Sequence, residues 1–117
     1  MGDKLIREIY YYEEYYLDFF SKLKPEVQKK FNWTLQLIAT MAIIPKKYFD
    51  HMTGTTGIFE IRVEVGSNIF RIFSFFDEGN LIVIGNGFVK KTQKAPKTEI
   101  EKALRIMEEY KNEKGRK

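Results

Sequence analysis

The sequence predicts one α+β domain over residues 1–117, with a twisted antiparallel sheet, a helical hairpin and a C-terminal helix packed on the sheet. Two observations predict this class. Apolar residues recur at helical spacing in the first and last thirds of the chain. The middle third instead alternates apolar and polar residues between tight turn signals. A length of 117 residues suits a single domain with one core, and the expected order of elements is β-α-α-β-β-β-α.

The first half of the chain is expected to form a strand and two helices. Residues 6–12 are a β-branched and aromatic run typical of a strand, and residues 15–23 carry apolar side chains at helical spacing. Pro25 suits the first turn of the next helix, because its missing N–H would be unpaired there in any case. We expect that helix to end near Pro45. Its predicted buried stripe is Val27, Phe31, Leu35, Ile38 and Ala42.

The second half is expected to form a three-stranded meander and a last helix. The predicted strands are residues 58–65, 69–76 and 81–91, separated by Gly- and Asn-containing turns. Thr98 followed three residues later by Glu101 forms a capping-box pattern, which predicts the start of the last helix. We expect the helices to cover one face of the sheet and to leave the other face open.

The composition excludes several classes of protein and site. The chain has no cysteine, which excludes disulfides, thiolate zinc sites and cysteine nucleophiles. Its one histidine, His51, has no acidic pair at ligand spacing, so we interpret it as a solvated loop residue and expect no metal or cofactor. The sequence contains no Gly-rich phosphate loop or nucleophile elbow. No signal peptide or span long enough for a bilayer is recognisable, so we expect a cytoplasmic protein without a membrane partner.

The net charge of +4 is concentrated in one short stretch. Residues 88–98 contain four lysines and no acid, whereas the rest of the chain holds equal numbers of basic and acidic residues. This distribution predicts an anionic partner near the end of the last strand. Two lysine pairs elsewhere, at 29–30 and 46–47, are expected to be solvated or to contact RNA phosphate.

Cationic residues also lie within the predicted strands. Arg62 and Arg71 are in the middle of adjacent strands, and Lys90 and Lys91 end the third strand. If these side chains gather on the open sheet face beside Phe73, guanidinium groups can bind phosphate and bases can stack on aromatic rings. The alternative is an ordinary exposed sheet face on which Arg62 pairs with neighbouring acids. These neighbouring acids are Glu60 and Glu64, two residues before and after Arg62. The pattern leaves both interpretations open.

Several segments in their order and spacing resemble the RelE/ParE toxin superfamily, and within it the HigB-like, phage-derived host-toxicity branch. The segments are GIFEIRV at 57–63, NIFRIF at 68–73, GFVKKTQK at 87–94 and PKTEIEKA at 96–103. The resemblance implies a single RelE-like toxin domain from a type II toxin–antitoxin system. It further implies a ribosome-dependent mRNA endoribonuclease (an mRNA interferase) that needs no metal and promotes attack of an RNA 2′-hydroxyl on the adjacent phosphate.

The resemblance also implies roles for particular residues. Arg62 and Arg71 would clamp the scissile phosphate, while Lys90 and Lys91 would stabilise charge or transfer protons. Phe88 would stack or pack near the site, and the peripheral RNA contacts would be Gln93 and Lys94. Asn86 stands where many relatives have a histidine, so the group that transfers the proton is not identified.

The implied partners are a cognate antitoxin, expected to be a helix-turn-helix DNA-binding protein, together with the ribosome and mRNA. Operator DNA would be contacted only through the antitoxin. Two other functions fit the same fold: a ParE-like inhibitor of DNA gyrase without nuclease activity, and an inactive domain that serves as an antitoxin-binding co-repressor.

Overall fold

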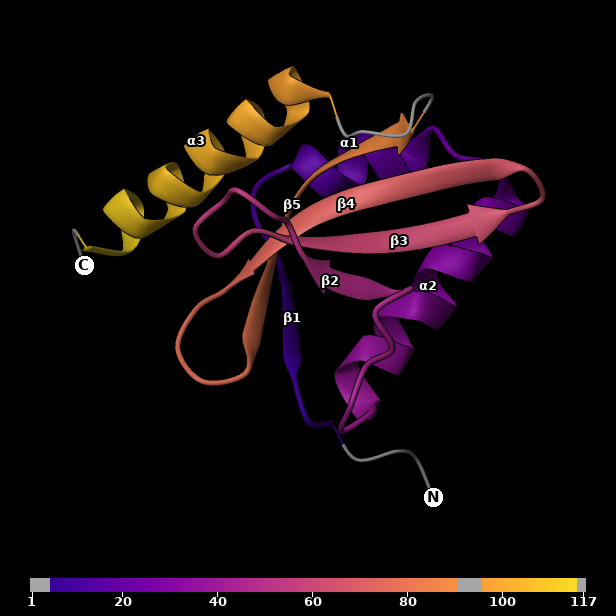
Figure 1. The fold of residues 1–117 in the computed structure, drawn as a ribbon, viewed down its shortest axis with the longest axis horizontal. Helices are drawn as coiled ribbons and strands as arrows, with labels where there is room; N and C mark the ends of the chain where they lie inside the picture. The colour runs from indigo at the N-terminus through magenta and orange to yellow at the C-terminus, as the bar shows by residue number, and fades with distance from the viewer. Residues whose placement is uncertain (1–4, 91–95, 116–117) are drawn as a thin grey trace.

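The computed structural model describes residues 5–90 and 96–115, with the backbone alone for Lys90. It confirms the α+β class and the predicted elements, and adds one short strand, β2, that the pattern did not predict (Figure 1). The elements are β1 Glu8–Tyr11, α1 Tyr15–Ser21, α2 Pro25–Thr40, β2 Phe49–His51, β3 Phe59–Val65, β4 Asn68–Phe76, β5 Leu81–Lys90 and α3 Lys97–Gly115.

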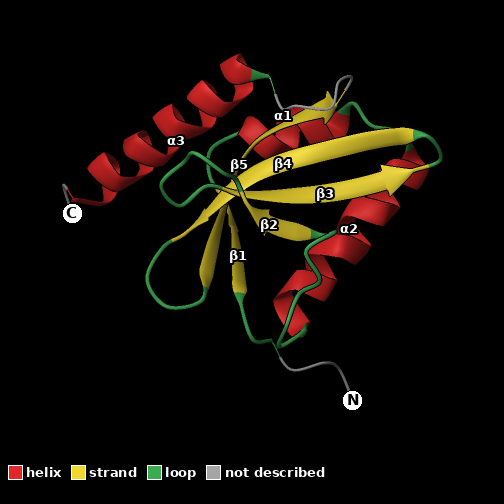
Figure 2. Ribbon diagram, in the orientation of Figure 1, coloured by secondary structure: helices red, strands yellow, loops and turns green. Residues whose placement is uncertain are grey.

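The five strands form one sheet in the order β1-β5-β4-β3-β2 (Figure 2). The meander β3-β4-β5 is antiparallel, as predicted, and β2 adds to it in the antiparallel sense. The first strand differs from the expectation, because β1 lies parallel to β5. The sheet is therefore mixed. Parallel pairing needs a long crossover connection, and the five elements between β1 and β5 provide it.

Helices cover both faces of the sheet, whereas we expected one face to be open. On one face α1 and α2 pack over a core that includes Phe31, Ile38, Ile61 and Ile72. On the other face α3 packs over β4 and β5 (Figure 1). Its buried residues contact Ile58, Phe73, Phe75, Val83 and Phe88. Six of the nine residues of β4 are accordingly apolar, and they lie on both faces, which is typical of a strand that is buried on both sides.

A β-bulge in β5 sets which side chains point toward α3. Ile72 pairs with Gly87 and Ser74 with Ile84, so two residues of β5, Gly85 and Asn86, lie opposite one residue of β4. A bulge of this kind changes the face on which the following residues lie. Beyond it Gly87 faces α1, where a Cβ atom would lie 2.4 Å from the ring of Phe19. Glycine therefore permits the close approach of α1 at this position.

Helix α2 ends at Thr40, earlier than the predicted end near Pro45. Arg7 explains this end, because its guanidinium donates hydrogen bonds to the carbonyl oxygens of Ile38, Met41 and Ala42 at 2.6–3.0 Å. A cation at a helix C-terminus also interacts favourably with the helix dipole. Ala42 is consequently exposed and outside the helix, so its place in the buried stripe was wrong. The other four residues of the stripe are buried as predicted.

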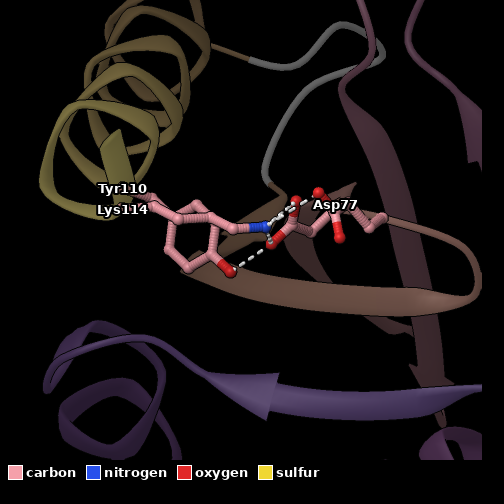
Figure 3. Close-up of polar contacts among 4 residues, drawn as sticks. Asp77, Tyr110 and Lys114 are labelled. Carbon is pink, nitrogen blue, oxygen red and sulfur yellow. Dashed lines mark hydrogen bonds and ion pairs between the residues drawn. The ribbon is translucent and has the colours of Figure 1, made fainter. Parts of the chain in front are cut away.

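Helix α3 begins at Lys97, which places Thr98 inside the first turn and not at the N-cap that the capping-box pattern predicted. The far end of the helix is attached to the β4–β5 turn through Asp77 (Figure 3). Tyr110 Oη donates to Asp77 at 2.6 Å, and Lys114 Nζ lies 2.7 Å from the same carboxylate. The hydrogen bonds from Lys114 and Tyr110 lower the pKa of Asp77 below its ordinary value, while burial and the Asp77 bond raise the pKa of Tyr110 to about 12.

Of the helices in the described residues, none combines the length and the apolar character needed to cross a membrane.

Replacing Arg7 by alanine should lower the free energy of unfolding by about 1–2 kcal/mol, because the last carbonyl groups of α2 lose a charged donor. Urea denaturation measures the change. Lys22→Ala, at the exposed end of α1, is the matched control and should change stability by less than about 0.5 kcal/mol. Equal effects of the two substitutions would show that Arg7 does not hold the end of α2.

Replacing Asp77 by asparagine should destabilise the protein in a pH-dependent way. A carboxyl group whose folded-state pKa is depressed contributes stability that is present above its ordinary value of 3.8 and is lost as the pH falls through the lower folded value. The difference in Tm between the wild type and Asp77→Asn should therefore be largest near neutral pH and shrink in acid. Asp50→Asn, at an exposed position of β2, is the control. A difference that stays constant down to acidic pH would contradict the assignment.

Candidate functional site

The strand register brings the two predicted arginines together. Arg62 of β3 lies directly opposite Arg71 of β4, and Arg71 lies opposite Phe88 of β5. We call these three residues the arginine row. Lys90 lies two residues further along β5 than Phe88, opposite Ile69. Three cationic residues from three adjacent strands thus hold nearby register positions, with Arg62 and Arg71 in the middle of their strands and Lys90 at the end of β5.

Both arginines have acidic partners on β3. Arg71 is only 7% exposed and forms an ion pair with Glu60, whose side chain is also largely buried. Arg62 is about one-third exposed and pairs with Glu64 at 2.9 Å. The sheet-face pairing that we considered as an alternative is therefore present for Arg62. Each guanidinium still has a buried Nε–H without a hydrogen-bond partner among the described residues.

The two ion pairs differ in strength because they differ in exposure. An exposed pair such as Arg62–Glu64 contributes little and exchanges partners easily, typically about 0–1 kcal/mol. A buried pair such as Arg71–Glu60 cannot lose one partner without leaving an uncompensated charge. Arg62 is thus free to take another anion, whereas Arg71 and Glu60 behave as a fixed unit.

Glu60 is the functional candidate that the sequence reasoning missed. It was considered only as a possible partner of Arg62, its neighbour on the same strand. The register places Glu60 opposite Phe73, diagonally next to Arg71, and the ion pair forms along that diagonal. A carboxylate held beside a guanidinium can accept a proton next to a bound phosphate. The signal in the sequence was the alternation of acid and arginine in Glu60–Arg62–Glu64, read with the correct cross-strand register.

The two predicted aromatic contacts are buried. Phe73 is 1% exposed and packs under α3 with Ile58 and Ala103, so its ring presents no surface on which a base can stack. This burial does not fit the predicted RNA contact, and we leave Phe73 out of the site. Phe88 is 8% exposed and its ring lies 5.2 Å from that of Phe73. Of the two roles considered for Phe88, the structure gives it the packing role.

Asn86, where many relatives are expected to have a histidine, holds the start of α3. Its side-chain nitrogen donates to the backbone oxygen of Glu99 at 3.2 Å and to the Glu99 carboxylate at 3.0 Å. His51 is exposed, as expected, but it lies in the edge strand β2 against the ring of Phe59. In residues 5–90 and 96–115, no three acidic or histidine side chains are grouped so that they could hold a metal ion. The predicted residues Lys91, Gln93 and Lys94 lie outside the described residues.

A groove of about 280 Å³ continues from Arg62 around the edge of the sheet. It forms where β3 extends beyond its pairing with β2, and the amide of Arg62 donates there to the carbonyl of Tyr48 at 2.9 Å. The lining residues are Lys30, Lys47, Tyr48, Arg62, Val63 and Glu64. Basic residues from α2, from the loop before β2 and from β3 therefore meet at one groove next to the arginine row.

Residues 18–108 match the family model of the phage-derived Gp49-like proteins (DUF891). The chain belongs to this family. The matched region runs from α1 into the second half of α3, so it includes the arginine row, Glu60 and Lys90. Membership of the Gp49-like family is compatible with a toxin of a toxin–antitoxin system. A comparison with curated proteins gave no significant match.

Removing Glu60 should destabilise the fold strongly because it leaves the buried Arg71 charge without a partner. Glu60→Leu is expected to lower the free energy of unfolding by about 3–5 kcal/mol. The double variant Glu60→Leu/Arg71→Met should recover most of this loss, since no buried charge then remains. Urea denaturation of the single and double variants measures the coupling.

The matched control is Glu64→Leu, which breaks the exposed pair with Arg62 and should cost no more than about 1 kcal/mol. If Glu60→Leu proved as mild as this control, or if the double variant were less stable than the single one, the buried pair would not be the interaction that holds the centre of the sheet.

Proposed function

We propose that this Gp49-like protein is the toxin of a type II toxin–antitoxin system and cleaves mRNA on the ribosome. The observation that carries the proposal is the convergence of Arg62, Arg71 and Lys90 on neighbouring positions of three strands, with the Glu60 carboxylate beside Arg71. Membership of the family supports the toxin part of the proposal. The nuclease part is supported by the chemistry that these side chains can perform.

The proposed reaction is an internal transfer within the RNA. The 2′-hydroxyl oxygen loses its proton and bonds to the adjacent phosphorus, the bond from phosphorus to the 5′-oxygen breaks, and that oxygen gains a proton. The products are a 2′,3′-cyclic phosphate and a 5′-hydroxyl. Charge that develops on the phosphate needs donors placed in advance. Arginine and lysine provide such donors, so the reaction does not require a metal.

The exposure of each ion pair suggests how the roles are divided. Arg62 exchanges Glu64 for the phosphate, because the exposed pair is weak. Arg71 remains next to Glu60 and orients the carboxylate, which accepts the 2′-hydroxyl proton. The negative charge that develops on the phosphate at the same time would replace the carboxylate charge in neutralising Arg71. Lys90, the last residue of β5, and Lys91, which follows it in the sequence, add positive charge and are candidates to protonate the leaving oxygen.

The proposed partners follow from this function. A cognate antitoxin would silence the toxin, and the ribosome with its bound message would present the substrate. Operator DNA would be reached through the antitoxin. The site of action would then be the cytoplasm, where translation takes place.

Induced expression with mapping of RNA ends tests the proposal. The wild type should arrest growth and produce breaks at codon positions of translated messages. Arg62→Ala, which removes a phosphate ligand at a partly exposed position, should reduce cleavage about 100-fold. Lys90→Ala should also reduce it. Arg105→Ala, which removes an exposed arginine from α3, is the matched control and should leave cleavage unchanged.

Unfolding curves of each variant are needed to show that lost cleavage is not lost structure. Growth arrest with intact mRNA and double-strand DNA breaks would contradict the nuclease and favour an inhibitor of DNA gyrase. Expression without any arrest would favour the inactive, antitoxin-binding co-repressor.

A further inference from the structure

The surface of α2 next to the groove carries an exposed aromatic pair. Trp33, the single tryptophan of the chain, is 47% exposed. Its ring meets that of Tyr48 edge-on, with centroids 5.7 Å apart and an angle of 74° between the planes. Tyr48 in turn lines the groove that leads to Arg62. Much of the Trp33 side chain is therefore open to solvent beside a basic groove.

Lysines lie over both rings. The Nζ atom of Lys30 is 4.4 Å from the centroid of the Trp33 ring, and that of Lys47 is 5.0 Å from the centroid of Tyr48. Both lysines also line the groove, together with Arg62. Among the described lining residues Glu64 is acidic, and it is already paired with Arg62. The groove is thus basic, with Tyr48 in its lining and Trp33 next to Tyr48.

This combination fits one class of ligand. Proteins that bind single-stranded nucleic acids combine a positively charged groove, which follows the backbone, with aromatic side chains on which bases stack. An acidic peptide would use the lysines but would have no need of an exposed tryptophan. The continuity of the groove with Arg62 connects it to the site at which a phosphate is proposed to bind.

We propose that single-stranded RNA passes from Arg62 along this groove to α2, where Lys30 and Lys47 bind its phosphates and one base stacks on Trp33. The groove with Trp33 is called the Trp33 platform. The assignment of RNA as the nucleic acid rests on the proposed function. Arg62 belongs both to the groove and to the arginine row, whereas Lys30, Lys47 and Trp33 lie outside the row. These three residues would hold the message beside the reacting phosphate without touching that phosphate.

Tryptophan fluorescence provides a specific test, because Trp33 is the only source of tryptophan emission. The probe is an unstructured eight-nucleotide RNA with 2′-O-methyl groups, which cannot be cleaved through a 2′-hydroxyl. We expect saturable quenching of Trp33 emission by this RNA and much weaker quenching by inorganic polyphosphate, which has charge but no bases.

Affinity is measured independently by the polarisation of a dye-labelled copy of the RNA. Trp33→Ala should weaken binding about tenfold, in line with the loss of one stacked base. Trp33→Phe keeps a ring for stacking and should retain most of the affinity. Tyr10→Ala removes an aromatic side chain of similar exposure from β1 and is the matched control.

The double variant Lys30→Gln/Lys47→Gln tests the phosphate contacts. The slope of log K against log salt should become less steep by about 1.4, which is the change expected for the loss of two phosphate contacts to a single strand.

The outcomes separate this inference from the proposed nuclease, since neither a ribosome nor cleavage is involved. Quenching by RNA with loss of affinity in Trp33→Ala supports the platform even if the protein cleaves no message. Equal quenching by RNA and polyphosphate would overturn it, as would RNA binding without any change in emission. Quenching by an acidic peptide but not by RNA would overturn it in favour of a protein partner.

Discussion

A guanidinium that is 7% exposed must be neutralised inside the protein, and Arg71 imposes this requirement on the central strand of the sheet. Glu60 meets it from the neighbouring strand. Next to this pair the bulge in β5 turns Phe88 toward α3, and α3 then closes that part of the sheet face. The buried pair, the bulge and the helix together restrict any open phosphate site to the β3 end of the arginine row. There Arg62 pairs with Glu64, its one acidic partner among the described residues, and Glu64 is exposed.

Much of the fold follows from local patterns, and its departures have physical causes. Helical spacing located α1 and α2, and alternation with turn signals located the meander. A three-residue edge strand such as β2 is too short to leave a periodic signal. The apolar residues that β4 carries on both of its faces already indicated that both sheet faces are buried, but the strands were interpreted as having one buried and one open face. The end of α2 depends on Arg7, which is more than thirty residues away and therefore leaves no local signal.

The sequence identified the cationic residues of the candidate site, but it did not show which side chains contact one another. Arg62 and Arg71 lie in the middle of strands that any antiparallel meander brings together. Their acidic partners depend on the exact register, and the same register buries Phe73. Trp33 of α2 and Tyr48 of the loop before β2 are fifteen residues apart, so only the tertiary structure shows that their rings meet and that Tyr48 lines one groove with Arg62. These two aromatic residues, not Phe73, offer a base a surface near the arginine row.

In the proposed reaction the 2′-hydroxyl of the RNA attacks the neighbouring phosphate. The protein supplies positive charge from arginine and lysine and a carboxylate that accepts the proton. The most direct test is a reconstituted translation reaction on a message in which one nucleotide, at a cleaved position, lacks its 2′-hydroxyl. This position should resist cleavage, while unmodified positions should yield 2′,3′-cyclic phosphate and 5′-hydroxyl ends. Cleavage of the 2′-deoxy position at the normal rate, or ends that carry a 5′-phosphate, would contradict the proposed reaction.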